Sequence, residues 1–270
     1  MENTIDDRAP IDFEETVRKH RHYIFSLAYR LTGRREEAED LAQETFLAAW
    51  EARTQLQERS AVLPWLRKIC VNAFLQRERK RSRAMEISYH ELSQLEEEGS
   101  RLQLSAPSPT PEEELLVDET IREIRDGCFT AMATRLPLEQ RVTFALVDIF
   151  GLNIEEAAAL LNRSLSATKA LLHRARRNLN AFFGRHCQWV LPENACRCAS
   201  WLEFAGRHEA LRKEVRRRNP APPDFNDPAF ASGSDPATME KVLSLFRNLP
   251  LRAPDEQWFQ KVLAVLKERR

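Results

Sequence analysis

Residues 136–179 read LPLEQRVTFALVDIFGLNIEEAAALLNRSLSATKALLHRARRNL, and residues 22–81 read HYIFSLAYRLTGRREEAEDLAQETFLAAWEARTQLQERSAVLPWLRKICVNAFLQRERKR. The first stretch has the spacing of a helix-turn-helix whose final helix is basic. The second is a helical block with an acidic middle and a basic end. A chain that carries both should bind an acidic ligand such as DNA and also a basic surface on a protein partner.

The composition predicts an all-α protein that resides in the cytoplasm. Only 7 of the 270 residues are glycine and 30% are charged, which favours helix over sheet. No apolar run approaches bilayer length and the N-terminus lacks a signal-peptide core, so no membrane partner is expected. The five cysteines are an odd number, and in a reducing compartment a disulfide framework is not expected.

The length and the charge pattern predict two helical domains, a linker and an extension. The formal net charge is zero, yet basic residues gather at the ends of both helical blocks and acidic residues gather between them. The acidic segment also contains three closely spaced prolines, which oppose regular structure. The expected parts are a first domain at 10–83, an acidic linker at 84–119, a helix-turn-helix domain at 120–184 and a C-terminal extension at 185–270.

The expected helix at 35–52 carries an acidic face. Four of its residues recur at the spacing i, i+3, i+4 and i+7, which places them on one side of a helix. Such a face suits docking onto a basic helical partner, although a charged stripe can also be merely solvated. The residues are Asp40, Gln43, Glu44 and Leu47.

The expected helix at 64–83 combines aromatic residues with a basic end. Aromatic side chains next to cations can stack on unpaired bases while the cations hold phosphates. Trp65 and Phe74 have helical spacing and can equally be core residues, whereas Asn72 would need hydrogen-bond partners if it were buried. The candidate DNA-binding residues here are Asn72, Arg77, Arg79, Lys80 and Arg81.

The helix-turn-helix has recognisable caps and a basic second helix. Asn153 and Glu156 have the spacing of a capping box, residues 162–165 form the turn, and Ser166 is expected to cap the next helix. A recognition helix presents its first residues to base edges and its cations to the phosphates. A helical hairpin without a DNA role is the alternative. The candidate DNA-binding residues are Ser166, Thr168, Lys169, His173, Arg174, Arg176 and Arg177.

The extension contains a cluster of metal-ligand residue types. Cys187, Cys196 and Cys198, with His186, could form a tetrahedral zinc or copper(I) site. Reduced cysteines in a small apolar patch are the alternative. Residues 241–266 add two amphipathic helices that need a partner surface, which the two domains themselves could supply.

The two blocks together resemble regions 2 and 4 of an extracytoplasmic-function sigma factor. AEDLAQETFLAAW, at 38–50, is similar to the polymerase-binding helix of that family. PWLRKICVNAFLQRERKR, at 64–81, is similar to its promoter-melting segment. GLNIEEAAALLNRSLSATKALLHRARRNL, at 151–179, is similar to the element that reads the −35 box.

The resemblance implies roles for individual residues. Asp40, Gln43, Glu44 and Trp50 fall where the family contacts the coiled coil of the β′ subunit of core RNA polymerase. Asn72 and the basic residues after it fall where the family captures the melted −10 element. The residues on the −35 recognition helix, which binds double-stranded promoter DNA, are Lys169, His173, Arg174 and Arg176. An anti-sigma factor would be a further partner.

The function expected from the sequence is therefore transcription initiation, with the extension as a regulator. No phosphate-binding glycine loop, zinc-protease motif or nucleophile motif is present, so no enzyme is expected. Two alternatives stay open at this point. One is a free-standing helix-turn-helix regulator that never touches polymerase. The other is a metal- or redox-sensing DNA-binding protein.

Overall fold

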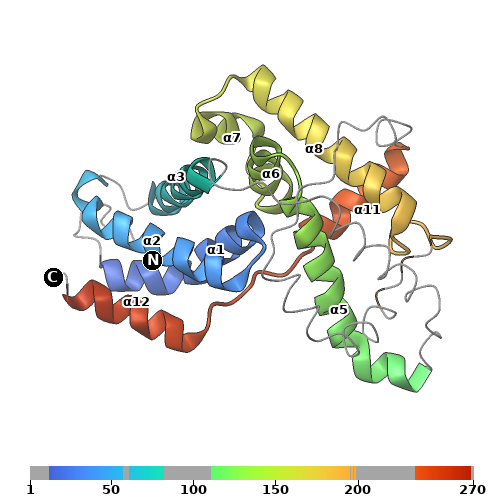
Figure 1. The fold of residues 1–270 in the computed structure, drawn as a ribbon. Coiled ribbons are helices and arrows are strands. Elements are labelled where there is room, and N and C mark those ends of the chain that lie inside the picture. Colours follow the sequence, from blue (N-terminus) through green and yellow to red (C-terminus); the bar gives the residue numbers. More distant parts are fainter. Residues whose placement is uncertain are drawn as a thin grey trace, which may run out of the picture. The chain divides into compact units, whose positions relative to one another are not determined.

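The computed structural model describes residues 12–56, 61–81, 111–194, 196, 198 and 235–268. The regular structure within these ranges is helical and includes no strand, which confirms the all-α prediction (Figure 1). None of the described helices is long and apolar enough to span a membrane. The chain divides into two compact units: residues 1–84 with 250–270, and residues 85–249.

Unit 1 is a group of amphipathic helices around one apolar core. The Asp12 carboxylate caps the first helix by accepting from the backbone N–H groups of Glu14 and Glu15. Gly33, at φ 73°, ends that helix in the left-handed conformation that glycine adopts readily. The elements are α1 (Phe13–Thr32), α2 (Arg35–Glu51), η1 (Arg53–Gln55), α3 (Val62–Arg81) and α12 (Glu256–Glu268).

The core of unit 1 forms where α1, α2 and α3 meet. Each helix contributes fully buried side chains, including Leu27, Phe46 and Leu66. Helix α12 comes from the far end of the chain and packs alongside these helices (Figure 1). Its apolar face is buried against α1 and α2, which gives it the partner surface that its amphipathic pattern requires.

Unit 2 contains the helix-turn-helix and an aromatic core. The Phe129 ring stacks on Phe183 with centroids 4.2 Å apart. Phe246 meets Phe129 and Phe144 edge-on, with both centroids 4.9 Å away. The elements are α5 (Pro111–Thr134), α6 (Leu138–Phe144), the π-helical turn η3 (Ala145–Ile149), α7 (Ile154–Leu161), α8 (Leu165–His186) and α11 (Pro236–Arg247).

The caps of the helix-turn-helix agree with the sequence except at one position. Asn153 and Glu156 form the predicted capping box, and Asn162 takes the left-handed conformation at φ 52°. The prediction that Ser166 caps α8 is wrong, because the Ser164 hydroxyl accepts from the Ala167 N–H instead. Both serines lie at positions that a cap can occupy, and the turn after Asn162 is short enough for the earlier one to serve.

The structure divides the C-terminal residues differently from the sequence analysis. The described residues of 185–270 form no separate unit: α11 lies in the core of unit 2 and α12 lies in unit 1. Helix α11 also approaches α8 closely, since a Cβ added at Gly184 would lie 3.1 Å from Thr238 Cγ2. Each helix buries its apolar face on the unit that offers it a complementary surface.

We expect Phe246→Ala to destabilise unit 2 by about 3–5 kcal/mol, the usual cost of removing a fully buried phenylalanine. Phe246 is 0% exposed and touches three other rings, so truncation leaves a cavity among them. Chemical denaturation followed by circular dichroism measures the loss. Leu251→Ala, at a position 60% exposed, is the control and should stay within about 0.5 kcal/mol of wild type. Equal losses in the two variants would contradict a core role for α11.

Candidate protein-docking and nucleic-acid interfaces

Helix α2 presents the predicted acidic face on one side of unit 1. Its other side supplies the buried residues Leu41, Thr45 and Phe46, which fixes the orientation of the helix. Asp40 and Glu44 are exposed, whereas Gln43 and Leu47 are half-buried. All four line one shallow surface groove, together with Ala48, Glu51 and Arg77. The sequence prediction that these four residues share a face is confirmed.

Arg77 reaches into this groove from α3. Its Nε donates to Glu44 Oε2 at 2.6 Å, and one of its terminal nitrogens donates to the Asp40 backbone carbonyl at 3.1 Å. Both side chains of the ion pair are more than a third exposed, so the pair contributes at most about 1 kcal/mol. A basic partner that docks on the groove could therefore displace Arg77 at little cost. Its predicted contact with DNA stays a prediction.

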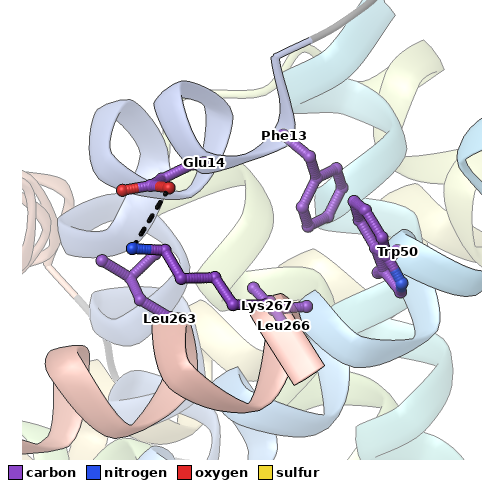
Figure 2. Close-up of a pocket in the computed structure, with 6 residues that line it drawn as sticks. All are labelled: Phe13, Glu14, Trp50, Leu263, Leu266 and Lys267. Atoms are coloured by element: carbon purple, nitrogen blue, oxygen red, sulfur yellow. Dashed lines mark ion pairs between the residues drawn. The ribbon is translucent and has the colours of Figure 1, made fainter. Parts of the chain in front are cut away.

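Trp50 lies apart from the other candidate polymerase-binding residues. It is 8% exposed, and the Phe13 ring meets it edge-on with centroids 5.3 Å apart. The Arg53 guanidinium lies 3.8 Å from its ring centroid. Figure 2 shows Trp50 facing a small pocket that it shares with Phe13 and with Leu263 and Leu266 of α12. Its polymerase contact stays a prediction, because little of the ring is accessible to a partner.

The basic end of α3 is mostly solvent-facing. Asn72 is exposed, so its amide needs no internal partner and is available to a ligand. Phe74 is buried in the core, as its helical spacing allows, and Trp65 is half-buried. Arg79 and Lys80 are exposed, whereas Arg81 is half-buried and pairs with Glu37 of α2 at 3.4 Å. The pair ties the end of α3 to the beginning of α2.

Helix α8 presents a row of exposed polar residues along one face. Ser166, Lys169 and His173 recur at three- and four-residue intervals, Arg174 directly follows His173, and all four are exposed. Arg177 is half-buried one turn further along. This row has the spacing and the charge that a recognition helix needs to meet base edges and phosphates.

Two candidate DNA-binding residues on α8 form their hydrogen bonds inside unit 2. Thr168 is buried, and its hydroxyl donates to the Ser164 carbonyl at 3.0 Å. Arg176 forms two parallel hydrogen bonds to Asp148, Nε to Oδ2 at 2.9 Å and Nη2 to Oδ1 at 2.8 Å. The hydrogen bond to Asp148 raises the pKa of Arg176. These contacts indicate structural roles for both residues.

The sequence analysis did not identify Asp148, although its position in an apolar run indicates a buried ion pair. It is 3% exposed and is the single charged residue in the apolar run FALVDIFGL, at 144–152. A carboxylate at such a position must find a cation, because an unpaired buried charge is strongly unfavourable. Arg247 of α11 is a second cation near it, with Nη2 3.6 Å from Asp148 Oδ1.

The cysteine cluster is partly assembled. Cys187 and Cys196 form an isolated backbone bridge, in which the Gln188 N–H donates to the Cys196 carbonyl. Burial, together with the nearby thiols of Cys187 and Cys196, raises the pKa of Cys198 to about 11. His186 is exposed and its ring packs beside Phe182. Within the described ranges no three His, Cys, Asp or Glu side chains are arranged to hold a metal ion. Zinc or copper binding therefore stays a prediction.

Comparisons with known proteins find a Sigma-70 region in each unit. Residues 16–84 match Sigma-70 region 2, and residues 126–179 match Sigma-70 region 4. The extracytoplasmic-function (ECF) RNA polymerase sigma factor SigE of Mycolicibacterium smegmatis is 32% identical over 184 residues, which are 68% of this chain and 66% of that protein. The ECF sigma factor SigM of Bacillus subtilis is 29% identical over 172 residues, 64% of this chain and 95% of that one.

A solved structure of a sigma factor also matches part of this chain. The sigma factor RpoE of Bartonella quintana, crystallised with the anti-sigma factor NepR, is 24% identical and has a TM-score of 0.42. The match covers 61% of this chain and 92% of that one. The matched stretch of this chain spans just under two thirds of SigE and 48% of SigG from Mycobacterium tuberculosis, so these relatives extend beyond it.

We expect Arg174→Ala to weaken binding to duplex DNA and to lower its salt dependence. Arg174 is exposed in the polar row of α8, and each lost phosphate contact reduces the slope of log K against log salt by roughly one unit. Fluorescence anisotropy at several salt concentrations measures the slope. An unchanged slope would rule out a phosphate contact at Arg174.

Arg176→Ala should instead reduce stability, by about 2–3 kcal/mol. Removing one partner of a buried ion pair usually costs more than that, but Arg247 remains near Asp148. The double variant Asp148→Leu, Arg176→Met is the control, because replacing both charges by apolar groups should recover most of the loss. Thermal unfolding measures both. A stable Arg176→Ala protein with a reduced salt slope would assign Arg176 to DNA after all.

Proposed function

Since this chain belongs to the extracytoplasmic-function group of RNA polymerase sigma factors, we propose that it directs core RNA polymerase to promoters. Its unit 1 binds the core enzyme and the −10 element, and its unit 2 binds the −35 element. It has no catalytic role of its own and acts in the cytoplasm. The observation that carries this proposal is the pairing of an open acidic groove in unit 1 with an exposed basic row in unit 2, each inside its matched family region.

The acidic groove fits a basic helical surface such as the coiled coil of the β′ subunit. Asp40 and Glu44 are exposed one turn apart on a helix whose opposite side is fixed in the core. Leu47 adds apolar surface one turn further on, and Gln43 can donate and accept hydrogen bonds. Two carboxylates beside a leucine give a partner both charge complementarity and a contact that excludes water.

The nucleic-acid surfaces support binding at two separate promoter elements. On α8, Lys169 and Arg174 can contact bases and phosphates in the major groove of the −35 element. On α3, the exposed Asn72 amide lies on the same helix as the exposed cations Arg79 and Lys80. An amide can bind the edge of an unpaired base while cations hold its phosphates, which suits the melted −10 element. The free energy of binding the unpaired strand would then stabilise the melted −10 element, without any catalytic step.

A free-standing helix-turn-helix regulator has no use for the groove on α2. Pull-down of core polymerase by the purified chain separates the two functions. A sigma factor is retained and supports transcription when it is added to core enzyme. A free-standing regulator is not retained, and core enzyme supplemented with it alone starts no promoter-specific transcript.

We expect the double variant Asp40→Lys, Glu44→Lys to bind core polymerase at least about 100-fold more weakly, because like charges across an interface cost several kcal/mol. Helix content should be unchanged, since both side chains are exposed. Equilibrium binding to labelled core enzyme measures the effect. Glu36→Lys, an exposed reversal on α2 outside the residues that line the groove, is the control. Wild-type affinity in the double variant would remove the groove from the interface.

A further inference from the structure

Two cysteines of unit 2 lie directly opposite each other in the backbone. Cys187 is the first residue after α8, and Cys196 lies beside it, further along the chain. The Cys196 N–H donates to the His186 carbonyl at 3.1 Å, and the Gln188 N–H donates to the Cys196 carbonyl at 3.3 Å. Cys196 therefore bonds to both neighbours of Cys187, which makes the two cysteines a bridged pair.

The spacing of such a pair suits a disulfide bond. Neighbouring chains joined by backbone hydrogen bonds lie about 4.8 Å apart, and directly paired residues point to the same face. Disulfides join residues whose Cα atoms lie about 4.4–6.8 Å apart. Burial and, to a smaller extent, the nearby Cys196 thiol raise the pKa of Cys187, which also indicates that the two sulfurs are close. Both cysteines are free in this structure.

The chain between the two cysteines is already folded against unit 2. The Val190 and Leu191 N–H groups both donate to the Cys187 carbonyl at 3.1 Å. The Asn194 amide donates to the same carbonyl and to that of Gly184, each at 3.1 Å. Val190 is fully buried in the core of unit 2. A bond between the cysteines would therefore close a turn that forms without it, and the backbone would need little rearrangement.

Cys196 is the member of the pair that an oxidant can reach. It is half-buried, whereas Cys187 is 7% exposed. Cys198 is as buried as Cys187 and has a hydrogen bond from the Trp189 side chain. Redox-sensing cysteines are accessible and often lie next to a second cysteine that resolves the first oxidation product. Cys196, with Cys187 beside it, has both features.

We propose that Cys187 and Cys196 form a reversible disulfide when the protein meets a peroxide. The Cys196 thiolate attacks one peroxide oxygen, and the O–O bond breaks. Cys196 becomes a sulfenic acid, and the leaving oxygen takes up the proton that the thiol has lost. The Cys187 thiol then attacks the Cys196 sulfur, and water leaves. Two thiols and one hydrogen peroxide thus give one disulfide and two waters, with the sulfurs oxidised and the peroxide reduced. A dithiol reductant reverses the reaction.

The bond would fasten the end of α8 to the chain that follows it. It closes a ten-residue loop, and a cross-link stabilises a fold by restricting the unfolded chain. Cys187 lies in the same core as Phe183 of α8 and Phe246 of α11. Oxidation therefore stabilises unit 2 and leaves unit 1, which has its own core, unchanged. The modification depends on the fold of unit 2 and not on what unit 2 binds.

The fragments that trypsin releases distinguish this bond from the other pairings. Trypsin cuts after arginine and lysine, so Cys187 and Cys196 lie together in one fragment, 186–197, which contains no third cysteine. The proposed bond removes two hydrogens from that single fragment. Cys198 and Cys128 each lie in a different fragment, so a bond to either of them would join two fragments.

The full-length protein is treated with one equivalent of hydrogen peroxide in the presence of a metal chelator. Its remaining thiols are blocked before digestion and mass spectrometry. Fragment 186–197 should lose two hydrogens and recover them after treatment with dithiothreitol. Cys196→Ser should not form the bond, whereas Cys198→Ser, the matched control, should still form it. The Cys70 thiol, which is fully buried in unit 1, should stay reduced.

Hydrogen exchange of the same samples measures the effect on stability. The α8 amides should exchange at least about tenfold more slowly in the oxidised protein than in the reduced one, while the α2 amides of unit 1 keep their rates. Cys196→Ser should keep the wild-type helix content and show no slowing after peroxide. Unchanged α8 exchange in the bonded protein would overturn the stabilising role. A main product that joins Cys198 or Cys128 to another fragment would overturn the pairing, as would a fragment 186–197 that keeps both thiols or only gains oxygen.

Discussion

The buried carboxylate of Asp148 is the constraint around which unit 2 is arranged. The Asp148 side chain is 3% exposed, and a buried carboxylate without a partner would be strongly unfavourable. Cations from other elements must therefore approach it. Arg176 supplies two hydrogen bonds from α8, and Arg247 approaches from α11. One side chain in the π-helical turn thereby sets the position of the recognition helix and of the C-terminal chain. The polar row on α8 faces away from the core because the opposite face of the helix, with Leu172, Ala175 and Leu179, is buried there.

Helix α2 shows how one element can serve a core and a docking surface at once. Its buried residues fix its rotation, and the groove residues are presented as a consequence. Arg77 partly neutralises the groove in the isolated protein, through an exposed and therefore weak ion pair. Glu44 is thus paired with Arg77 in the isolated protein, and a more basic partner can still displace Arg77 from the groove.

The sequence alone predicted the structural features that depend on the local pattern of residues. The all-α class, the capping box at Asn153 and the shared face on α2 follow from periodicity and cap chemistry within a few residues. Local pattern also offers near-equivalent choices, which is why Ser164 rather than Ser166 caps α8. Pairings across long sequence distances could not be predicted. Asp148 and Arg176 are 28 positions apart in the sequence, and Trp50 shares its pocket with leucines more than 200 residues away.

The placement of α11 and α12 has a consequence for how the chain folds as it is made. Synthesis delivers α1, α2 and α3 first, and these helices can bury their own core at once. Unit 2 is different, because its three phenylalanines on α5, α6 and α8 pack against Phe246, which is synthesised 60 residues after the end of α8. Until then the nascent unit exposes an aromatic surface. Completion of the C-terminal helices is therefore a checkpoint for quality control, because a prematurely terminated chain would retain a recognition helix on an unfinished and protease-sensitive domain.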